Sequence, residues 1–477
     1  MTVVAKKTIQ IQLERLAEEH FEELDVRFTD ALGNWRHVTV PASVVDEEFF
    51  HRGIGFDGST LKGMTLTESG DLILQPDPRR VFEDPFTTRK TLVVFADIIH
   101  PDTGKPFSKD PRGVARKAAG YLRSSGMATD SFWAPEFEFY IFDKVSFWIE
   151  PGNQGYCLKS IEAPENSINP DSKGFVHSGE SGYHMMYPVD SLHDIRSEMA
   201  FHMQKAGMQI KYHHHEVGRM GQSEIEVNFA PFLSAADNVM LGKHIIRNVA
   251  LKHDLSATFM PKPIEGEPGS GMHFHLFMTN NQNRIFYDKH RYCNLSKIAL
   301  SAIAGILHHA PAICAFSNAT VNSYRRLVPG QEAPVYRFFS GPNRSASIRV
   351  PSYARTPDSM RFEYRVPDGS GNPYLSMSAI LMAAIDGMKK KMNPQKLGYG
   401  PIDENVFSPD FDKSGLPVLP QILEEALDAL EEDREFLQEN DVFASELIDD
   451  YIKVKREEAY SFYGSPHPRE HSLYFSL

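Results

Sequence analysis

Stretches with helical spacing of apolar residues alternate along the chain with strand-like stretches. Five apolar residues recur at three- to five-residue intervals near the N-terminus, and they predict a helix over residues 8 to 24: Ile9, Leu13, Leu16, Phe21 and Leu24. Residues 25 to 100 then show short strand-like runs between Gly and Pro turns. The N-terminal part is therefore expected to be a small β-rich domain.

A turn-rich segment, PDTGKPFSKDPRG at residues 101 to 113, precedes the next helical pattern, from about Val114 to Ser125. It is the best linker candidate, so we expect one domain over residues 1–110 and a larger one over residues 111–477. Further predicted helices alternate there with strand-like runs: residues 192 to 206, 234 to 252, 296 to 309, 372 to 391, 417 to 432 and 443 to 458. This pattern is typical of the α+β class. The region from 147 to 181, rich in Pro, Gly, Asn and Ser, is expected to be surface loop.

Composition narrows the possible functions. Among 477 residues, 50 Lys and Arg against 63 Asp and Glu give a net charge of −13, which argues against a nucleic-acid partner. The three cysteines form no CxxC pair, so neither disulfides nor a thiolate zinc site is expected, and a reducing, cytoplasmic location fits. The N-terminus lacks an apolar signal segment, and the most apolar helix candidate, around Leu375 to Met388, is interrupted by Asp386. We therefore predict neither secretion nor a membrane span.

Four strand-like segments place polar residues at every second position, and a pleated strand turns such residues onto one face. The polar residues are Glu136, Glu138 and Tyr140; Glu224, Glu226 and Asn228; His273 and His275; and Arg361, Glu363 and Arg365. Each segment alone could be an amphipathic strand that exposes its charges to solvent. Together, and flanked by bulky apolar residues, they favour buried strands, where a carboxylate must be paired or metal-bound to avoid a large desolvation cost.

Several carboxylates with one imidazole suit hard divalent cations, Mg²⁺ or Mn²⁺, better than zinc. Two such ions beside arginines would make a phosphoryl-transfer site. Two segments, NSYRRLVPGQEAP and GPNRSASIRVP, supply arginines that suit carboxylate or phosphate oxygens, or alternatively surface salt bridges: Arg325, Arg326, Arg344 and Arg349. Glu332 lies in a loop between Gly330 and Pro334 and could act as a lid or base. The glycine-rich GEPGSGMH lacks the Lys and Ser or Thr of a Walker motif, so it is a weak phosphate-loop candidate.

From FDGST at 56–60 to NPYL at 372–375, these motifs resemble the bacterial type I glutamine synthetase family. The resemblance is carried by EFEFYIF, HHEVG with GQSE, FMPKP with GSGMHFH, TVNSYRRLVPG with EAP, NRSASIRVP and FEYRVPD. It implies a β-grasp N-terminal domain and a catalytic domain whose antiparallel sheet forms a funnel surrounded by helices. The implied activity is ATP-dependent ligation of glutamate and ammonia to glutamine through γ-glutamyl phosphate.

The resemblance also implies roles for individual residues. Two or three Mg²⁺ or Mn²⁺ ions are expected, the first held by Glu138, Glu216 and Glu224, and the second by Glu136, His273 and Glu363. The implied catalytic residues are Asp57, which binds ammonium, Glu332 on a mobile flap, and Arg344 at the transferring phosphoryl group. The implied substrate residues are Arg326, Arg365, Gly269 and Tyr183, and the implied nucleotide residues are Phe229, His275, Arg349 and Arg361.

Asp57 would come from the neighbouring subunit, so the resemblance implies a homo-oligomer, a dodecamer of two six-membered rings. The C-terminal SLYFSL would dock into the opposite ring. Four positions depart from the family pattern. Pro268 replaces an Asn that touches glutamate, Phe277 a Ser that bonds the nucleotide, and Asp358 a Lys near its phosphates. Phe407 stands where regulated members carry an adenylylated Tyr, so no adenylylation is expected, although Tyr399 lies nearby.

Three alternatives remain open at this point. A γ-glutamyl amine ligase would keep the metals and ATP but accept a polyamine, and Pro268 leaves room for it, whereas Asp57 and Tyr183 favour ammonia. A non-catalytic homologue would usually lose a metal ligand or the flap acid, and neither is lost here. A zinc hydrolase or phosphatase is suggested by His213, His214 and His215 in YHHHEVG, but most of these histidines are expected to be satisfied locally.

Overall fold

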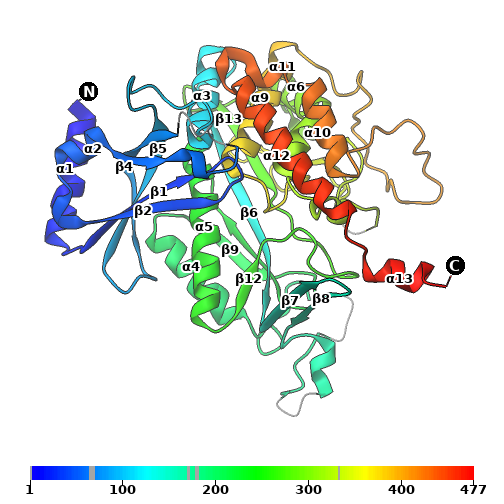
Figure 1. Cartoon of the computed structure of the whole chain (residues 1–477). Coiled ribbons are helices and arrows are strands. Elements are labelled where there is room, and N and C mark those ends of the chain that lie inside the picture. The colour runs from blue at the N-terminus through cyan, green and yellow to red at the C-terminus, as the bar shows by residue number, and fades with distance from the viewer. Residues whose placement is uncertain (1–2, 64–69, 169–171, 178–181, 331–332, 477) are drawn as a thin grey trace.

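Two sheets, one in each part of the chain, organise the computed structural model (Figure 1), which describes residues 3–63, 70–168, 172–177, 182–330 and 333–476. The N-terminal sheet has the strand order β2-β1-β5-β4-β3, with β1 and β5 parallel at its centre and the other pairs antiparallel. Its strands are β1 (Glu23–Thr29), β2 (Trp35–Pro41), β3 (Ile54–Asp57), β4 (Asp71–Asp84) and β5 (Thr91–Ile99), accompanied by helices α1 (Val3–Glu18) and α2 (Glu47–Arg52).

Helix α1 ends earlier than its apolar pattern predicts. His20 has a φ of 57°, a left-handed conformation that stops the helix, and β1 begins at Glu23. Phe21 and Leu24 are nevertheless buried in the same core as Ile9 and Leu16. The predicted helix over residues 8 to 24 is thus wrong at its C-terminal end, because residues of a turn and a strand continue the apolar spacing of the helix.

The second sheet carries the candidate site. Its main order is β15-β16-β17-β13-β6-β10-β9, antiparallel except for the β15–β16 pair, with β11 and β12 also paired to β6 and β14 paired to β13. The strands are β6 (Asp130–Phe142), β9 (Ile210–His215), β10 (Gln222–Val227), β11 (Ala230–Pro231), β12 (Ser256–Thr258), β13 (Phe274–Asn280), β14 (Asn283–Arg284), β15 (Phe339–Ser340), β16 (Ile348–Arg349) and β17 (Phe362–Tyr364). The predicted α+β class is confirmed.

Helices pack around this sheet and one another. They are α3 (Pro111–Ser124), α4 (His193–Lys205), α5 (Phe232–Lys252), α6 (Lys297–His308), α7 (Ala310–Ser317), α8 (Ser323–Arg326), α9 (Pro373–Lys389), α10 (Leu423–Glu432), α11 (Glu435–Gln438), α12 (Ser445–Tyr463) and α13 (Pro468–Tyr474). All residues of α9 from Pro373 to Met388 are buried, and α9 contacts α3, α5, α6 and α7. The helices predicted in this part of the chain lie within three residues of the observed ones, except that α10 begins six residues later and α12 ends five residues later than predicted.

Buried charges hold the two parts of the chain together. The guanidinium of Arg112, on α3, donates to Asp237 of α5 at 2.9 Å, to Asp97 of β5 at 2.7 Å and to Asp77 of β4 at 3.2 Å. Tyr374 of α9 donates to the same Asp237 carboxylate at 2.7 Å. Because a buried charge must be paired, this network fixes how the N-terminal sheet meets the helices of the larger part.

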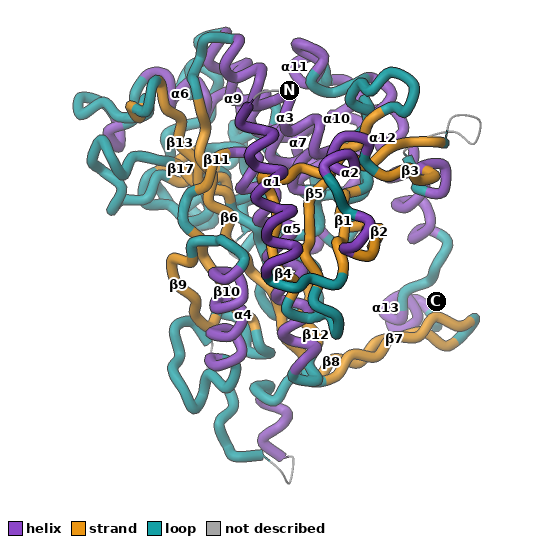
Figure 2. Tube along the Cα trace, turned by 90° about the vertical axis from the view of Figure 1, so that its left-hand side faces the viewer, coloured by secondary structure: helices purple, strands orange, loops and turns teal. Residues whose placement is uncertain are grey.

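The region expected to be loop contains a hairpin. Strands β7 (Lys144–Glu150) and β8 (Asn153–Lys159) pair with each other, and their side chains are mostly exposed, including Phe147 and Ile149. The surface position was predicted correctly, but the loop assignment, which began at residue 147, was wrong over residues 147 to 150 and 153 to 159. Figures 1 and 2 show α13 beside this hairpin, where Ser465 donates to Gln154 at 3.3 Å.

One helical stretch, Lys297–Ser317, is long and apolar enough to cross a membrane by length and composition alone. It comprises α6 and α7, and 72% of its most apolar window is buried inside the molecule. The choice of Leu375 to Met388 as the most apolar helix candidate missed this stretch. Its packing is that of core helices.

Candidate active site

Strand register brings the four polar segments together at the centre of the large sheet. Strand β6 pairs on one side with β10, so that Glu138 lies opposite Glu224 and Glu136 opposite Glu226. On its other side β6 pairs with β13, and His275 of β13 lies opposite Glu363 of β17. Carboxylates from distant parts of the chain therefore converge, and the interpretation of these segments as solvent-facing strands is wrong.

His273, Glu136 and Glu363 form one half of this cluster, and all three are buried. The Nδ1 atom of His273 lies 2.9 Å from Glu136 Oε2, 3.6 Å from Glu138 Oε1 and 3.5 Å from Glu363 Oε1. Burial opposes the ionisation of Glu136, but the charge of His275 and hydrogen bonds from His273 and His275 outweigh it and hold its pKa well below the usual value.

Two arginines complete this half. Glu363 accepts from Arg349 Nη1 at 2.9 Å and from Arg365 Nε at 3.0 Å. Burial and the charge of Glu136 oppose ionisation of Glu363, yet Arg365, His275 and His273 lower its pKa. Among the residues that the structure describes, Arg365 Nη1, Arg349 Nε and Arg361 Nε are buried and lack a hydrogen-bond partner. These donors are available to an anion beside Glu363.

The other half has an excess of carboxylates. His214 Nε2 lies 3.4 Å from Glu224 Oε2, and its Nδ1 lies 4.0 Å from Glu216 Oε1. Burial, followed by the charges of Glu136 and Glu216, raises the pKa of Glu224 well above its usual value. A divalent cation would remove this repulsion, and oxygen ligands are those that Mg²⁺ and Mn²⁺ prefer. The residues present therefore fit such a cation.

The guanidinium of Arg326 lies beside the His273 ring. It is buried, and its guanidinium donates to the carbonyl oxygens of Val366 at 2.8 Å and Arg365 at 3.1 Å. The segment with Gly269 runs against it, because a Cβ at Gly269 would lie 2.7 Å from Arg326 Cγ. Glycine is thus required there by close approach. Pro268 is one of the positions that depart from the pattern of the resembled family. Its carbonyl oxygen accepts a hydrogen bond from the Tyr140 hydroxyl at 2.7 Å.

Tyr183 and Arg344 lie near the carboxylate-rich half. Burial and the charges of Glu216 and Glu224 raise the pKa of the Tyr183 phenol, while the guanidinium of Arg344 opposes that shift. Arg344 itself is exposed, in the loop between β15 and β16. The structure thus brings Tyr183 close to the carboxylates and Arg344 close to Tyr183.

A cluster of aromatic rings and arginines lies beside β13 and β14. The ring of Phe277 is 4.8 Å from that of Phe229, and Arg284 lies over Phe277 at 3.5 Å from its centroid. Arg361 lies 5.8 Å from the Phe229 centroid. Asp358 also departs from the pattern of the resembled family, and its carboxylate interacts electrostatically with the Arg284 guanidinium. Phe277 also stacks on Phe132, with ring centroids 5.1 Å apart, and is 5% exposed, so neighbouring side chains cover its ring at the position where the resemblance implies a Ser hydroxyl.

Asp57, another predicted residue, does not join the site within one subunit. Asp57 ends β3, and Figure 2 shows β3 on the opposite side of the molecule from β9, β10 and β17. Its pKa is lowered by hydrogen bonds from the Ser59 side chain and backbone. Glu332 lies outside the described residues.

Sequence comparison identifies the family. The sequence model described as "Glutamine synthetase, catalytic domain" matches residues 108–474, and the one described as "Glutamine synthetase, beta-Grasp domain" matches residues 20–101. The chain belongs to the glutamine synthetase family. The family and the class of enzyme predicted from the sequence, an ATP-dependent ligase that uses divalent metal ions, are thereby confirmed.

Relatives match over nearly their whole length. The chain is 43% identical to glutamine synthetase of Aquifex aeolicus over 99% of this chain and 100% of that one, and 42% identical to that of Mycolicibacterium smegmatis over 99% and 100%. Among solved structures, Plasmodium falciparum glutamine synthetase superimposes with a TM-score of 0.88 at 28% identity, covering 98% of each chain. These relatives do not favour the γ-glutamyl amine ligase or the zinc hydrolase.

Some residues at the glutamine synthetase site were not given a role from the sequence. Glu226 accepts from Lys211 Nζ at 2.5 Å and from the Tyr212 hydroxyl, and a carboxylate oxygen of Glu226, one of Glu136 and a ring nitrogen of His275 lie within 4.8 Å of one another. The signal available in the sequence was its position two residues after Glu224, which puts both carboxylates on one face of the strand. Nothing in the sequence indicated a role for Arg284, because only the fold brings it over Phe277.

Proposed function

We propose that this chain is a glutamate–ammonia ligase, which makes glutamine from glutamate and ammonia through γ-glutamyl phosphate, with ATP as the phosphoryl donor. The observation that carries the proposal is the convergence of Glu136, Glu138, Glu216, Glu224, His273 and Glu363, with guanidinium groups at Glu363. Such a site combines cation ligands with donors for phosphate oxygens.

In this proposal Glu138, Glu216 and Glu224 hold one metal ion, and Glu136, His273 and Glu363 hold the next. Two or three Mg²⁺ or Mn²⁺ ions are proposed per site. When bound, the ions would neutralise charge on the phosphate oxygens of ATP. The raised pKa of Glu224 and the orphan donors of Arg365 and Arg349 support this arrangement.

The chain's own residues would bind and orient the substrates. Arg326, held rigid by backbone carbonyls, and Gly269 beside it form the glutamate subsite. Arg344 and Arg365 would stabilise the negative charge of the phosphoryl group during transfer. Tyr183 and a neighbouring subunit's Asp57 would bind ammonium and take up its proton, and Glu332, outside the described residues, would close over the site.

The nucleotide would bind beside the aromatic cluster that contains Phe229. Phe229, His275, Arg349 and Arg361 are its proposed ligands, and the placement of His275 and Arg349 beside Glu363 and of Arg361 over Phe229 supports this.

The proposal extends to assembly. We propose domains over residues 1–110 and 111–477, and a dodecamer of two hexameric rings in the cytoplasm. The distance of β3 from the carboxylate cluster supports a shared site, because Asp57 can reach only another subunit's cluster.

The test is phosphate release from Mg²⁺-ATP and glutamate, measured with ammonia and with a panel of amines. Release only with ammonia is expected; release only with larger amines would identify a γ-glutamyl amine ligase, and no release with any amine a non-catalytic homologue. Arg344→Ala and Glu136→Ala should abolish the ammonia-dependent rate without unfolding the protein. Glu150→Ala is the matched control, because this carboxylate is exposed on β7.

A further inference from the structure

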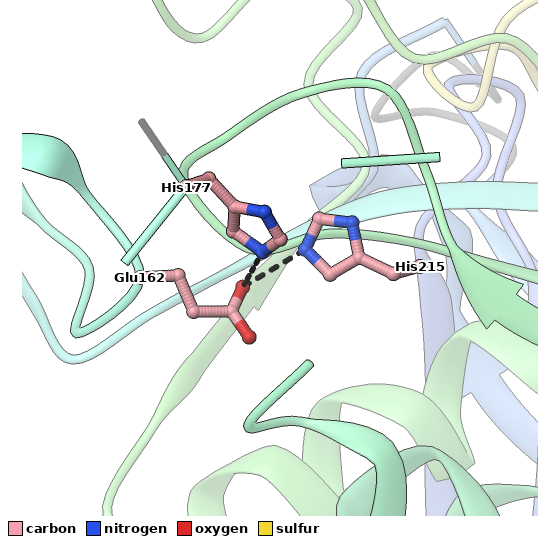
Figure 3. Close-up of side chains that lie close together, drawn as sticks. All are labelled: Glu162, His177 and His215. Carbon is pink, nitrogen blue, oxygen red and sulfur yellow. Dashed lines mark hydrogen bonds and ion pairs between the residues drawn. The ribbon is translucent and has the colours of Figure 1, made fainter. Parts of the chain in front are cut away.

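Three residues far apart in the sequence meet in the interior beside the candidate active site (Figure 3): Glu162, His177 and His215. Their exposed fractions are 0%, 2% and 0%. The Nε2 atom of His215 lies 2.9 Å from Glu162 Oε2, and that of His177 lies 3.9 Å from the same oxygen. Figure 3 shows both rings turned toward this carboxylate oxygen.

His177 is the unusual member of this group. Among the described residues neither of its ring nitrogens has a hydrogen-bond partner, although the side chain is buried. A buried polar group without a partner costs about 1–3 kcal/mol. The Nε2 atom of His177 points at the Glu162–His215 pair, so a ligand held between the three side chains would satisfy it.

The hydrogen bonds around the group leave one ligand atom free on each of the other two residues. Glu162 Oε1 accepts from the backbone N–H and the hydroxyl of Ser191, both at 2.8 Å, so Oε2 is left for the imidazoles. His215 Nδ1 lies 2.6 Å from the carbonyl oxygen of Glu216 and donates to it. The lone pair of His215 Nε2 then faces Glu162 Oε2, an arrangement that needs a cation or a proton between them.

A proton on His215 would satisfy that pair but would leave His177 without a partner. A metal ion would bind Nε2 of both imidazoles and Oε2 of Glu162, and so satisfy the three atoms that face one another. With ligand distances of about 2.0–2.2 Å, the ligand atoms of a tetrahedral zinc site lie roughly 3.4 Å apart. The observed separations of 2.9 and 3.9 Å bracket that value.

We propose that Glu162, His177 and His215 bind a transition-metal dication, with zinc as the best fit. Two imidazoles and one carboxylate form a zinc-type ligand set, unlike the carboxylate-rich set at Glu216 and Glu224. A water molecule would complete a tetrahedral site. No such ion takes part in the reaction proposed above.

This site is separate from the carboxylate cluster because side chains alternate along β9. His214 faces Glu224, at 3.4 Å, whereas His215, the next residue, faces Glu162 on the other side. Glu216 follows His215 directly. The ion would therefore sit behind the strand that carries a proposed catalytic metal ligand.

The ion would fix the segment that carries Tyr183. The backbone of His177 donates to the Glu162 carbonyl at 3.0 Å, and the N–H groups of Gly182 and His184 donate to the carbonyls of Val217 and His215 at 3.0 and 3.1 Å. Glu162 and His177 are thus positioning residues, because a cation shared with His215 would tie this segment to the end of β9.

The test uses the whole protein, stripped by a chelator, saturated with Mg²⁺ and titrated with Co²⁺. We expect one equivalent of Co²⁺ per subunit with the intense visible absorption of four- or five-coordinate cobalt, displaced by Zn²⁺, and a higher midpoint of thermal unfolding with Zn²⁺. His177→Ala and Glu162→Gln should weaken this binding about 100-fold or more, since loss of a ligand exceeds the 10- to 100-fold effect of an outer-shell change.

Two controls separate this site from others. His213→Ala should keep the cobalt signal, because His213, on the same strand, lies 3.3 Å from Ser197 and outside the group. Glu224→Ala should keep it as well, which distinguishes the site from the carboxylate cluster. His177→Ala loses no hydrogen bond between described residues, and Glu162→Gln keeps an acceptor for Ser191, so both should fold. The proposal is overturned if the wild-type protein shows no such absorption, or if the absorption survives both variants.

Discussion

Glu363 shows how a single side chain combines structural and chemical demands. It is buried, accepts hydrogen bonds from two arginines and lies within 3.5 Å of His273. A carboxylate there balances the charges of Arg349 and Arg365 and still offers an oxygen to a metal ion. Removing its charge would leave two guanidinium groups underneutralised in the interior.

Glu363→Gln is therefore expected to lower the ammonia-dependent rate by about 1,000-fold, equivalent to about 4 kcal/mol of transition-state stabilisation. Phosphate release in the presence of glutamate, ammonia and Mg²⁺-ATP measures the rate, and circular dichroism checks the fold. Glu150→Gln, on exposed β7, should leave the rate unchanged. A Glu363→Gln rate within tenfold of the wild type would contradict the assignment.

Phe407 and Tyr399 decide whether the chain can be adenylylated in or near the loop over residues 403 to 410. Phe407 lacks a hydroxyl and packs against Phe338, Ala346 and Val406. Tyr399 is 5% exposed, and Arg337 lies over its ring. We expect mass spectrometry after incubation with a bacterial adenylyltransferase and ATP to find no AMP on the peptide spanning residues 397 to 411. A modified Tyr399 in folded protein would refute this.

At the scale of elements, helices α6 and α9 cross at two glycines. A Cβ at Gly305 would collide with the carbonyl oxygen of Ala383 and lie 2.7 Å from Gly387 Cα. Gly305→Ala is expected to destabilise the protein by about 1–3 kcal/mol, because backbone cannot move aside as a flexible side chain can. Gly120→Ala on α3 is the control: its Cβ meets nothing within 4 Å, so a gain of about 0.5–1 kcal/mol is expected. Urea unfolding of both variants measures the difference, and equal stabilities would contradict the tight crossing.

His309, between α6 and α7, links these helices to α9 and α10. Its ring nitrogens lie 3.0 Å from Asp386 and 2.7 Å from Asp433, and although burial opposes the charge, these carboxylates raise its pKa. A histidine with a raised pKa stabilises the fold fully below its unfolded pKa of about 6.5, and this contribution is lost as pH rises through the folded value.

His309→Gln should therefore cost about 2 kcal/mol at pH 6 and clearly less at pH 9. Urea unfolding at both pH values measures the two costs. His308→Gln is the matched control, because burial lowers the pKa of His308 and its loss should not give this pH trend. A cost for His309→Gln that grows with pH would contradict the charged state proposed for its ring.

The sequence predicted elements well where one face is buried. Helices α4, α5 and α6 were predicted within two residues, because their apolar residues pack on a core and set the period. The β7–β8 hairpin was missed because both of its faces are largely exposed, so no period-two pattern marks it. The polar residues at every second position of β6, β10 and β17 correctly indicated that these segments meet. Strand pairing places the polar faces of paired strands side by side.

At the scale of the molecule, long-range pairing cannot be read from spacing. Glu162 and His215 are 53 residues apart, and nothing in either segment indicates that they meet. The same holds for Arg112, whose buried carboxylate partners come from β4, β5 and α5. Such contacts depend on how the layers pack, which local patterns do not encode.

The position of β3 makes a prediction about the assembly. Asp57 is remote from the carboxylate cluster of its own subunit, so each site would need the N-terminal domain of a neighbour. Asp57→Asn subunits and Glu363→Gln subunits should each be inactive alone. In mixed oligomers, an interface that joins the N-terminal domain of a Glu363→Gln subunit to the catalytic domain of an Asp57→Asn subunit contains both intact parts.

Co-expression of the two variants in equal amounts should therefore restore about one quarter of the wild-type rate, because random assembly makes one interface in four complete. The measurement is ammonia-dependent phosphate release by oligomers purified through tags on both variants. Mixing Glu136→Gln with Glu363→Gln is the control, since both lesions lie in the same catalytic domain and no interface is complete. If the Asp57→Asn and Glu363→Gln mixture regains no more activity than this control, Asp57 does not act across a subunit boundary.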